Sequence, residues 1–185
     1  EALESELARH ADHKLVAHVR EAIALPDLAP GYAADLRQIF GDGAWPAPTA
    51  ATDEYVAALR NADPVELVAA LFILYGALVV GGGKQTQRKV KRLLPGCDHV
   101  LFDVSEDMRD ARRRFKNAFT SIGKDHAGVA AVAPECADDL VRYASLYMRR
   151  NNAVVLSARV TPAWFWPVVT VGAAVAFVVA RRRRQ

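Results

Sequence analysis

The chain has 185 residues, 52% of them hydrophobic and 24% charged, and a formal net charge of only +3. This composition suits one globular domain with an appended segment, and part of the small charge comes from C-terminal arginines, so bulk charge gives no reason to expect nucleic-acid binding. The two cysteines, Cys97 and Cys136, lack metal-motif spacing. They do not indicate a disulfide-stapled secreted module, and two reduced thiols are expected.

The N-terminal part has the pattern of amphipathic helices. Apolar residues at helical spacing predict one helix over residues 1–25, which Pro26 and Pro30 end because proline lacks an amide donor. A short second helix is expected over residues 32–40 and is stopped by glycines. A third helix is expected to begin with Thr52 as its cap.

The longest apolar stretch follows. Asp63 is its predicted N-cap and Pro64 its first residue, where a missing N–H costs nothing. A helix that is apolar on all sides must be buried on all sides, so the rest of the domain is expected to surround this one. The stretch ends in Gly81, Gly82 and Gly83, which indicates either a helix end or a place where another group approaches the backbone closely.

The second half of the chain is also helical in pattern. A basic helix is predicted over residues 84–94, and two more helices begin at Ser105 and near residue 135. Residues 99–104 are short and apolar and are the one strand-like piece. Because an isolated strand is not stable alone, residues 1–160 are expected to form an all-α domain around the central helix.

A separate segment follows at the C-terminus. About 18 residues from Ala163 to Ala180 carry no charge, near the lower limit for crossing a bilayer. Tryptophans at one end and the basic tail of residues 181–185 at the other suit the two membrane–water interfaces. We therefore predict a transmembrane tail anchor in the lipid bilayer, with a soluble core helix as the other interpretation. The short span favours a mitochondrial membrane, and the endoplasmic reticulum is the alternative.

Four stretches match one known family in the same order. Leu67 through Tyr75 to Gly82 is similar to the pattern L-V-A-H-x-Y-x-R-Y-L-G-D-L-S-G-G-Q. Residues 15–23, 35–45 and 114–119 are similar to the family's second helix, its D-L-x-x-x-x-G-x-x-W segment and its F-K-x-x-Y/F helix. On these stretches the chain resembles the haem oxygenase family. The resemblance implies an all-α fold, a glycine-bent distal helix over the haem and a C-terminal membrane anchor.

The positions that carry the family's chemistry differ in this chain. The family's iron-ligating histidine lies well before its second helix, and His10 and His13 are too close to the matching segment to replace it. The family's upstream histidine, tyrosine and arginine align with Ala70, Phe72 and Leu74, which are apolar. The resemblance therefore implies that the family's polar network is absent from this chain. Apolar side chains at these positions leave no buried polar group unpaired, so the interior can pack without that network.

The remaining haem-facing positions of the family fall on small or apolar residues. Its distal Gly-Asp pair aligns with Ala77 and Leu78, and a leucine cannot organise water. If haem binds, the resemblance implies contacts from this vestigial distal helix, including Gly81 and Gly82. Lys116 keeps a charge that suits a carboxylate.

Other motifs give weaker signals. The segment around Lys84 misses the phosphate-loop pattern, because Gln85 stands where the Ser or Thr is needed. His10 and His13 are candidate metal ligands, but no acid or third histidine converges with them, and surface histidines are expected. The basic clusters at residues 84–92 and 109–116 lack interleaved aromatic residues, so no nucleic-acid partner is expected.

Two functional hypotheses follow. The first is a non-catalytic, haem-oxygenase-like protein anchored to a membrane, which acts as a structural or accessory subunit of a membrane complex, with that complex's subunits as partners and no cofactor. The second uses haem, either as a haem oxygenase that cleaves haem to biliverdin or by binding haem without turnover. Leu78 and the apolar residues upstream favour the first hypothesis, because haem chemistry needs an axial ligand and a distal hydrogen-bond system.

Overall fold

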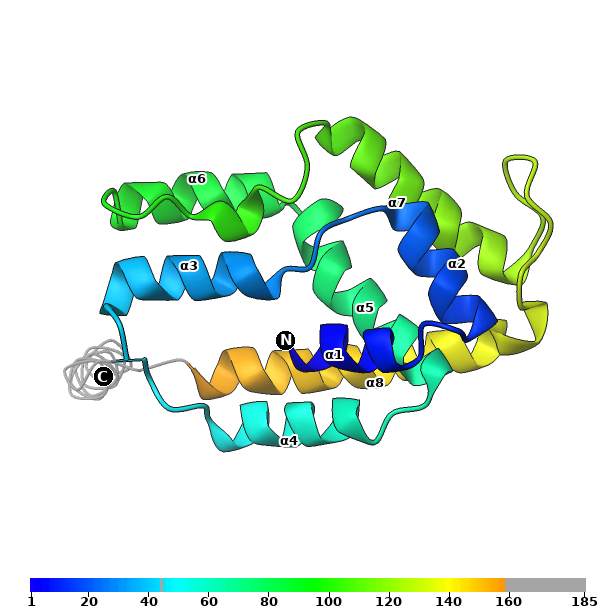
Figure 1. Ribbon diagram of the computed structural model, residues 1–185, viewed down its shortest axis with the longest axis horizontal. Coiled ribbons are helices and arrows are strands. Elements are labelled where there is room, and N and C mark those ends of the chain that lie inside the picture. Colours follow the sequence, from blue (N-terminus) through cyan, green and yellow to red (C-terminus); the bar gives the residue numbers. More distant parts are fainter. Residues whose placement is uncertain (44, 159–185) are drawn as a thin grey trace, which may run out of the picture.

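A computed structural model of the chain describes residues 1–43 and 45–158. Within that part the fold is built from helices only, as predicted (Figure 1). The α-helices are α1 (Ala2–Arg9), α2 (Lys14–Ile23), α3 (Ala29–Phe40), α4 (Ala50–Arg60), α5 (Pro64–Val79), α6 (Gly83–Leu93), α7 (Met108–Gly123) and α8 (Ala137–Ser157). Two short 3₁₀ helices, η1 (Val100–Phe102) and η2 (Pro134–Cys136), lie in the connections.

The apolar helix α5 is the centre of the domain. It packs against α1, α2, α4, α6, α7 and α8, and its buried residues include Leu67, Val68 and Leu71 (Figure 1). Burial on every side was too strong an expectation, however, since Phe72 and Val80 each remain 41% exposed. One stripe of α5 is therefore left uncovered by the other helices.

Side-chain caps fix where several helices begin. The Asp63 carboxylate accepts a hydrogen bond from the Glu66 amide at 2.8 Å, which confirms the predicted cap of α5. The predicted cap of α4 was three residues late, because Thr49 is the cap and accepts from the Thr52 amide. Similarly, α7 begins after Asp107 rather than at Ser105.

The predicted single helix over residues 1–25 is wrong. The chain turns at residues 10–13, so α1 and α2 are separate helices. The physical reason is that they pack on different neighbours: α1 packs against α4 and α5, whereas α2 packs against α5 and α7. A straight helix cannot reach both sets, and no proline or glycine marks the turn in the sequence.

The three glycines after α5 form a helix end and a bend of 60° between α5 and α6. The carbonyl oxygen of Gly76 accepts from both the Val80 amide, at 2.9 Å, and the Gly81 amide, at 2.8 Å. Gly82 then adopts a φ of 98°, which favours glycine. A Cβ on Gly83 would lie 2.5 Å from the Leu78 carbonyl oxygen. The group that approaches the glycine backbone is therefore the end of α5 itself.

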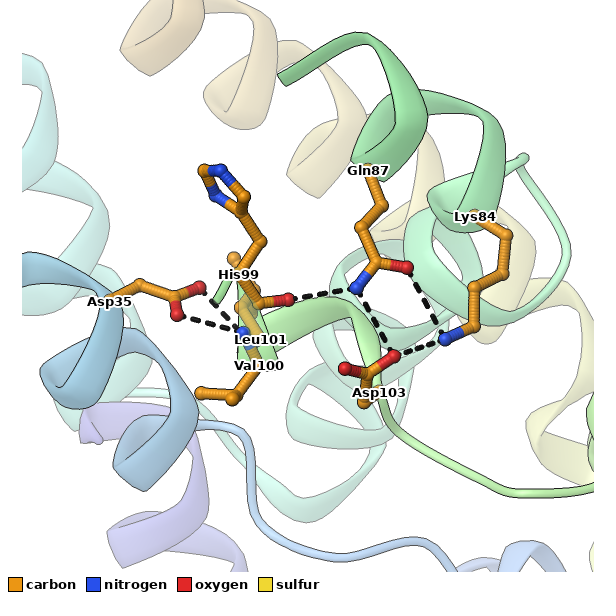
Figure 2. A network of polar contacts seen from close by, with 7 residues as sticks. All are labelled: Asp35, Lys84, Gln87, His99, Val100, Leu101 and Asp103. Carbon is orange, nitrogen blue, oxygen red and sulfur yellow. Dashed lines mark hydrogen bonds and ion pairs between the residues drawn. The ribbon is translucent and has the colours of Figure 1, made fainter. Parts of the chain in front are cut away.

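Residues 99–104, the one strand-like piece of the sequence, form no strand, and residues 100–102 form the 3₁₀ helix η1. Asp35, a buried residue of α3, accepts hydrogen bonds from the Val100 amide at 2.8 Å and the Leu101 amide at 3.1 Å (Figure 2). These amides lie at the start of η1, where a helix lacks internal partners. A carboxylate distant in sequence thus replaces the strand partner that the segment lacks.

The other side of η1 is fastened to α6. The Gln87 amide donates to the His99 carbonyl oxygen at 3.0 Å and to the Asp103 carboxylate at 3.1 Å, and Lys84 also bonds to Asp103 (Figure 2). The bond from Lys84 is the main cause that lowers the pKa of Asp103 below its ordinary value. Because that folded-state pKa is lowered, the contribution of Asp103 to stability is present above its unfolded pKa and is lost as the pH falls through the folded one.

Helices long and apolar enough to cross a bilayer singly do not occur in the described part of the chain. Together α5 and α6 have the necessary length and hydropathy, but the 60° bend separates them. The predicted anchor at residues 163–180 and the basic tail at residues 181–185 lie outside the described residues.

Gly83→Ala is expected to destabilise the fold by roughly 1–3 kcal/mol, because the added methyl meets a backbone carbonyl that cannot move aside cheaply. Urea unfolding followed by circular dichroism measures the difference. Gly96→Ala is the matched control, since nothing lies within 4 Å of its added Cβ. An equal loss in both variants would contradict the packing role of Gly83.

Asp35→Ala is expected to lower the free energy of unfolding by roughly 1–3 kcal/mol, because the Val100 and Leu101 amides lose their acceptor in a partly buried site. Asp103→Ala removes a half-exposed ion pair and is expected to cost below about 1 kcal/mol. The same denaturation experiment compares the two, and a larger loss at Asp103 would refute the assignment.

Candidate functional site

The uncovered stripe of α5 forms the floor of an apolar groove. Both α7 and α8 pack on α5, and the groove runs between them as two adjoining hollows of about 400 and about 610 Å³, each within the size range of ligand pockets. Phe72, Phe119 and Thr120 line both hollows. One end is narrow, because the backbone of Gly123 at the end of α7 meets Ala137 at the start of α8.

Three phenylalanines form one wall of the groove. Phe72 of α5 stacks on Phe115 of α7 with ring centroids 5.8 Å apart, and it meets Phe119 edge-on at 4.9 Å. Phe115 and Phe119 are in turn 4.8 Å apart. Such pairs add to the stability gained from burial alone, so this wall is a rigid part of the groove.

Few polar residues line the groove. Lys116 and Thr120 of α7 and Asn151 of α8 border the larger hollow, and Lys124 borders the smaller one. Neither hollow is lined by an acidic residue among those described. The groove therefore combines an apolar floor with positive charge along its α7 edge.

Three of the predicted haem-facing positions line this groove, and two do not. Ala77, Gly81 and Lys116 border the larger hollow. Leu78 packs instead against the hydrophobic core, and Gly82 forms the N-cap of α6. The bent helix thus presents a surface at the expected place, but its residues there offer no side-chain hydrogen bond.

The upstream positions of the resemblance belong to the core and the groove wall. Ala70 is fully buried, Leu74 packs against the core, and Phe72 is part of the aromatic wall. Tyr75, by contrast, is buried and donates to Glu4 of α1 at 3.2 Å. The space that polar side chains would need is filled by apolar ones.

The histidines do not converge on a site. His10 and His13 were expected on one helix, but the structure places them on either side of the turn between α1 and α2. His18 pairs with Ser121 at 3.0 Å, and His126 with Asn117 at 3.1 Å. Within the described residues, no group of three or more His, Cys, Asp or Glu side chains is placed to hold a metal ion.

The groove fits a haem enzyme poorly. Protein ligands of haem iron are His, Cys, Tyr or Met, and among the residues that line the groove only Met148 is of these types. No acidic or histidine side chain stands among the described residues that line either hollow. The lining suits an apolar occupant better than it suits iron chemistry.

Residues of α8 were missed as groove residues in the sequence. The helical spacing predicts an inner stripe of Leu140, Tyr143, Ala144, Tyr147 and Val154. Tyr147 is fully buried, which raises its pKa to about 12. Val141 and Met148 lie off that stripe and line the groove. Their signal was a second apolar stripe on a helix that needs only one to pack.

A partly buried acid near the N-terminus was also missed. Glu4 accepts hydrogen bonds from the Leu28 amide at 2.5 Å and the Ala29 amide at 3.1 Å, at the start of α3. Burial raises the pKa of its carboxyl, but these bonds and the nearby N-terminal charge outweigh it, so the pKa is lower than usual. Glu4 thereby ties α1, α3 and α5 together and has a structural role.

Comparison with protein-family models, with curated proteins and with solved structures found no match to this chain. The resemblance to haem oxygenases thus stays a prediction from the sequence.

Proposed function

We propose that this protein is a non-catalytic, haem-oxygenase-like structural or accessory subunit of a membrane complex, most simply one of a mitochondrial membrane, held there by residues 163–180. The observation that carries the proposal is the groove, whose floor and walls are apolar where an enzyme of the resembled family needs polar groups. A surface of this kind favours association with another apolar surface over chemistry.

The shape and charge of the groove suit one kind of partner. Two helices border it and a third forms its floor, which is the arrangement that receives an amphipathic helix. Lys116 and Lys124 stand on the same edge without an acidic neighbour in the lining. We therefore propose that the partner subunit contributes a helix with an apolar face and acidic residues along one side.

In native membrane extracts the protein is expected to migrate in a complex much larger than a monomer on a blue-native gel. Val141→Lys combined with Met148→Lys is expected to release the monomer, because two charges would enter an apolar interface. The matched control is Val129→Lys, which adds a charge to an exposed residue in the loop after α7 and leaves the groove unchanged. A wild-type chain that migrates as a monomer in such extracts would refute the accessory role.

A second candidate, haem binding without turnover, is favoured by one observation: Ala77, Gly81 and Lys116 line the same hollow at the positions that the resemblance indicates. Haemin titration of the full chain in detergent separates the candidates. We expect no saturating Soret shift beyond that of free haemin, because the lining lacks a strong axial ligand. A one-to-one shift that Met148→Leu abolishes would instead establish haem binding in the groove.

A further inference from the structure

Apolar side chains gather at one end of the molecule. The ends of α3, α6 and α8 point toward the same end of its long axis, opposite the loop that joins α7 to α8 (Figure 1). Leu93, the last residue of α6, is 79% exposed, and Leu156 in the last turn of α8 is 59% exposed. The other large exposed apolar residues of these helix ends and of the connection after α3 are Ile39, Phe40, Trp45, Leu94 and Val155. We call these seven residues the apolar end.

The helix ends are held in place relative to one another. The Gln38 amide donates to the Asp98 carboxylate at 2.7 Å, and the Asp98 backbone amide donates to Gln38 at the same distance, which fixes α3 to the segment after α6. Thr49 at the start of α4 pairs with Ser157 at the end of α8 at 2.7 Å. Hydrogen bonds thus hold the helix ends in two pairs at this end of the molecule, α3 with the segment after α6 and α4 with α8.

Trp45 has the features of an interfacial tryptophan. Its indole N–H donates to the Gly41 carbonyl oxygen at 3.2 Å, and the Arg37 guanidinium lies 5.9 Å from its ring centroid. The ring is 41% exposed. An aromatic ring with a satisfied N–H and a cation beside it suits the boundary between headgroups and acyl chains.

Positive charge borders the apolar end. Arg88, Lys91 and Arg92 of α6 are exposed, and among the described ion pairs none involves them. Basic residues beside an apolar surface are attracted by the negative charge of anionic lipid headgroups. An apolar protein interior carries no negative charge that would attract them. Charge and hydropathy thus favour the same partner, a lipid bilayer.

The path of the chain places this end near the membrane. Ser157 ends α8 at the apolar end, and the predicted span begins at Ala163. A linker this short reaches at most about 20 Å. We infer that the apolar end docks on the surface of an anionic bilayer, so that the domain lies against the membrane into which its tail is inserted. This inference rests on the proposed membrane anchorage.

Tryptophan fluorescence of the full chain in vesicles tests the docking. In a Trp164→Phe/Trp166→Phe background, Trp45 is the one remaining tryptophan. The protein is inserted into phosphatidylcholine and phosphatidylserine vesicles with or without brominated acyl chains, and vesicle flotation reports insertion. We expect brominated lipid to quench Trp45, because a docked ring lies at the acyl boundary. The matched control, Trp45→Phe with Val129→Trp, places the tryptophan in the loop at the opposite end and is expected to stay unquenched (Figure 1).

Charge removal gives a second readout in the same vesicles. Lys91→Gln with Arg92→Gln is expected to lower the docking equilibrium constant roughly thirtyfold, since each basic residue near an anionic surface contributes about fivefold. Lys14→Gln with Arg142→Gln, near the opposite end and outside the groove lining, is expected to leave the quenching of Trp45 unchanged.

The outcomes distinguish the inference from the proposal beneath it. A chain that floats with the vesicles but leaves Trp45 unquenched would overturn the docking and leave the anchorage intact. A chain that does not float would overturn both. Quenching of Trp45 and of Val129→Trp alike would also overturn it, because the contact would then not be specific to the apolar end.

Discussion

The burial of α5 is the constraint on which the rest of the structure depends. This helix is so apolar that water is an unfavourable neighbour on all sides, and six other helices pack around it. Most of them cover it with an apolar stripe, whereas the polar helix α6 buries only Gly83 and Gln87. The turn between α1 and α2 is one result, because a single straight helix cannot cover two separate parts of that surface.

The other helices leave α5 uncovered in one place, and the proposed function rests on this gap. Between α7 and α8 the side chains of α5 remain in contact with solvent, although nothing polar occupies the space. An exposed phenylalanine brings no stability to a monomer. In a subunit that receives a partner, the same side chain becomes buried in the interface and stabilises the complex. Three positions that the sequence resemblance indicates as haem-facing, Ala77, Gly81 and Lys116, line this same gap.

Much of the fold could be predicted from local signals. The cap at Asp63 and the breaks at Pro26 and at the three glycines after α5 act within a few residues, so the sequence displays them directly. The features that sequence reasoning missed depend on distant partners. Asp35 stabilises η1 across 65 residues of chain, and the conformation of residues 99–104 stayed open because nothing near them in the sequence reveals that carboxylate. The groove was partly missed because it also depends on distant partners. The apolar residues on α5 and α7 can be identified in the sequence, but the space between α7 and α8 arises only when both helices pack on α5.

The way in which α6 is attached has a consequence for local unfolding. Within the described residues this helix packs mainly against α5 and η1, and of its own residues Gly83 and Gln87 are the buried ones. Its opening would expose almost no apolar surface and would break mainly backbone hydrogen bonds and the bonds of Gln87 and Lys84. Folded proteins open first where the free energy of local unfolding is lowest. The amides of α6 are therefore expected to exchange with solvent before those of α5, although the two helices follow one another directly across the bend. The domain thus consists of a slowly exchanging core and one arm that unfolds separately.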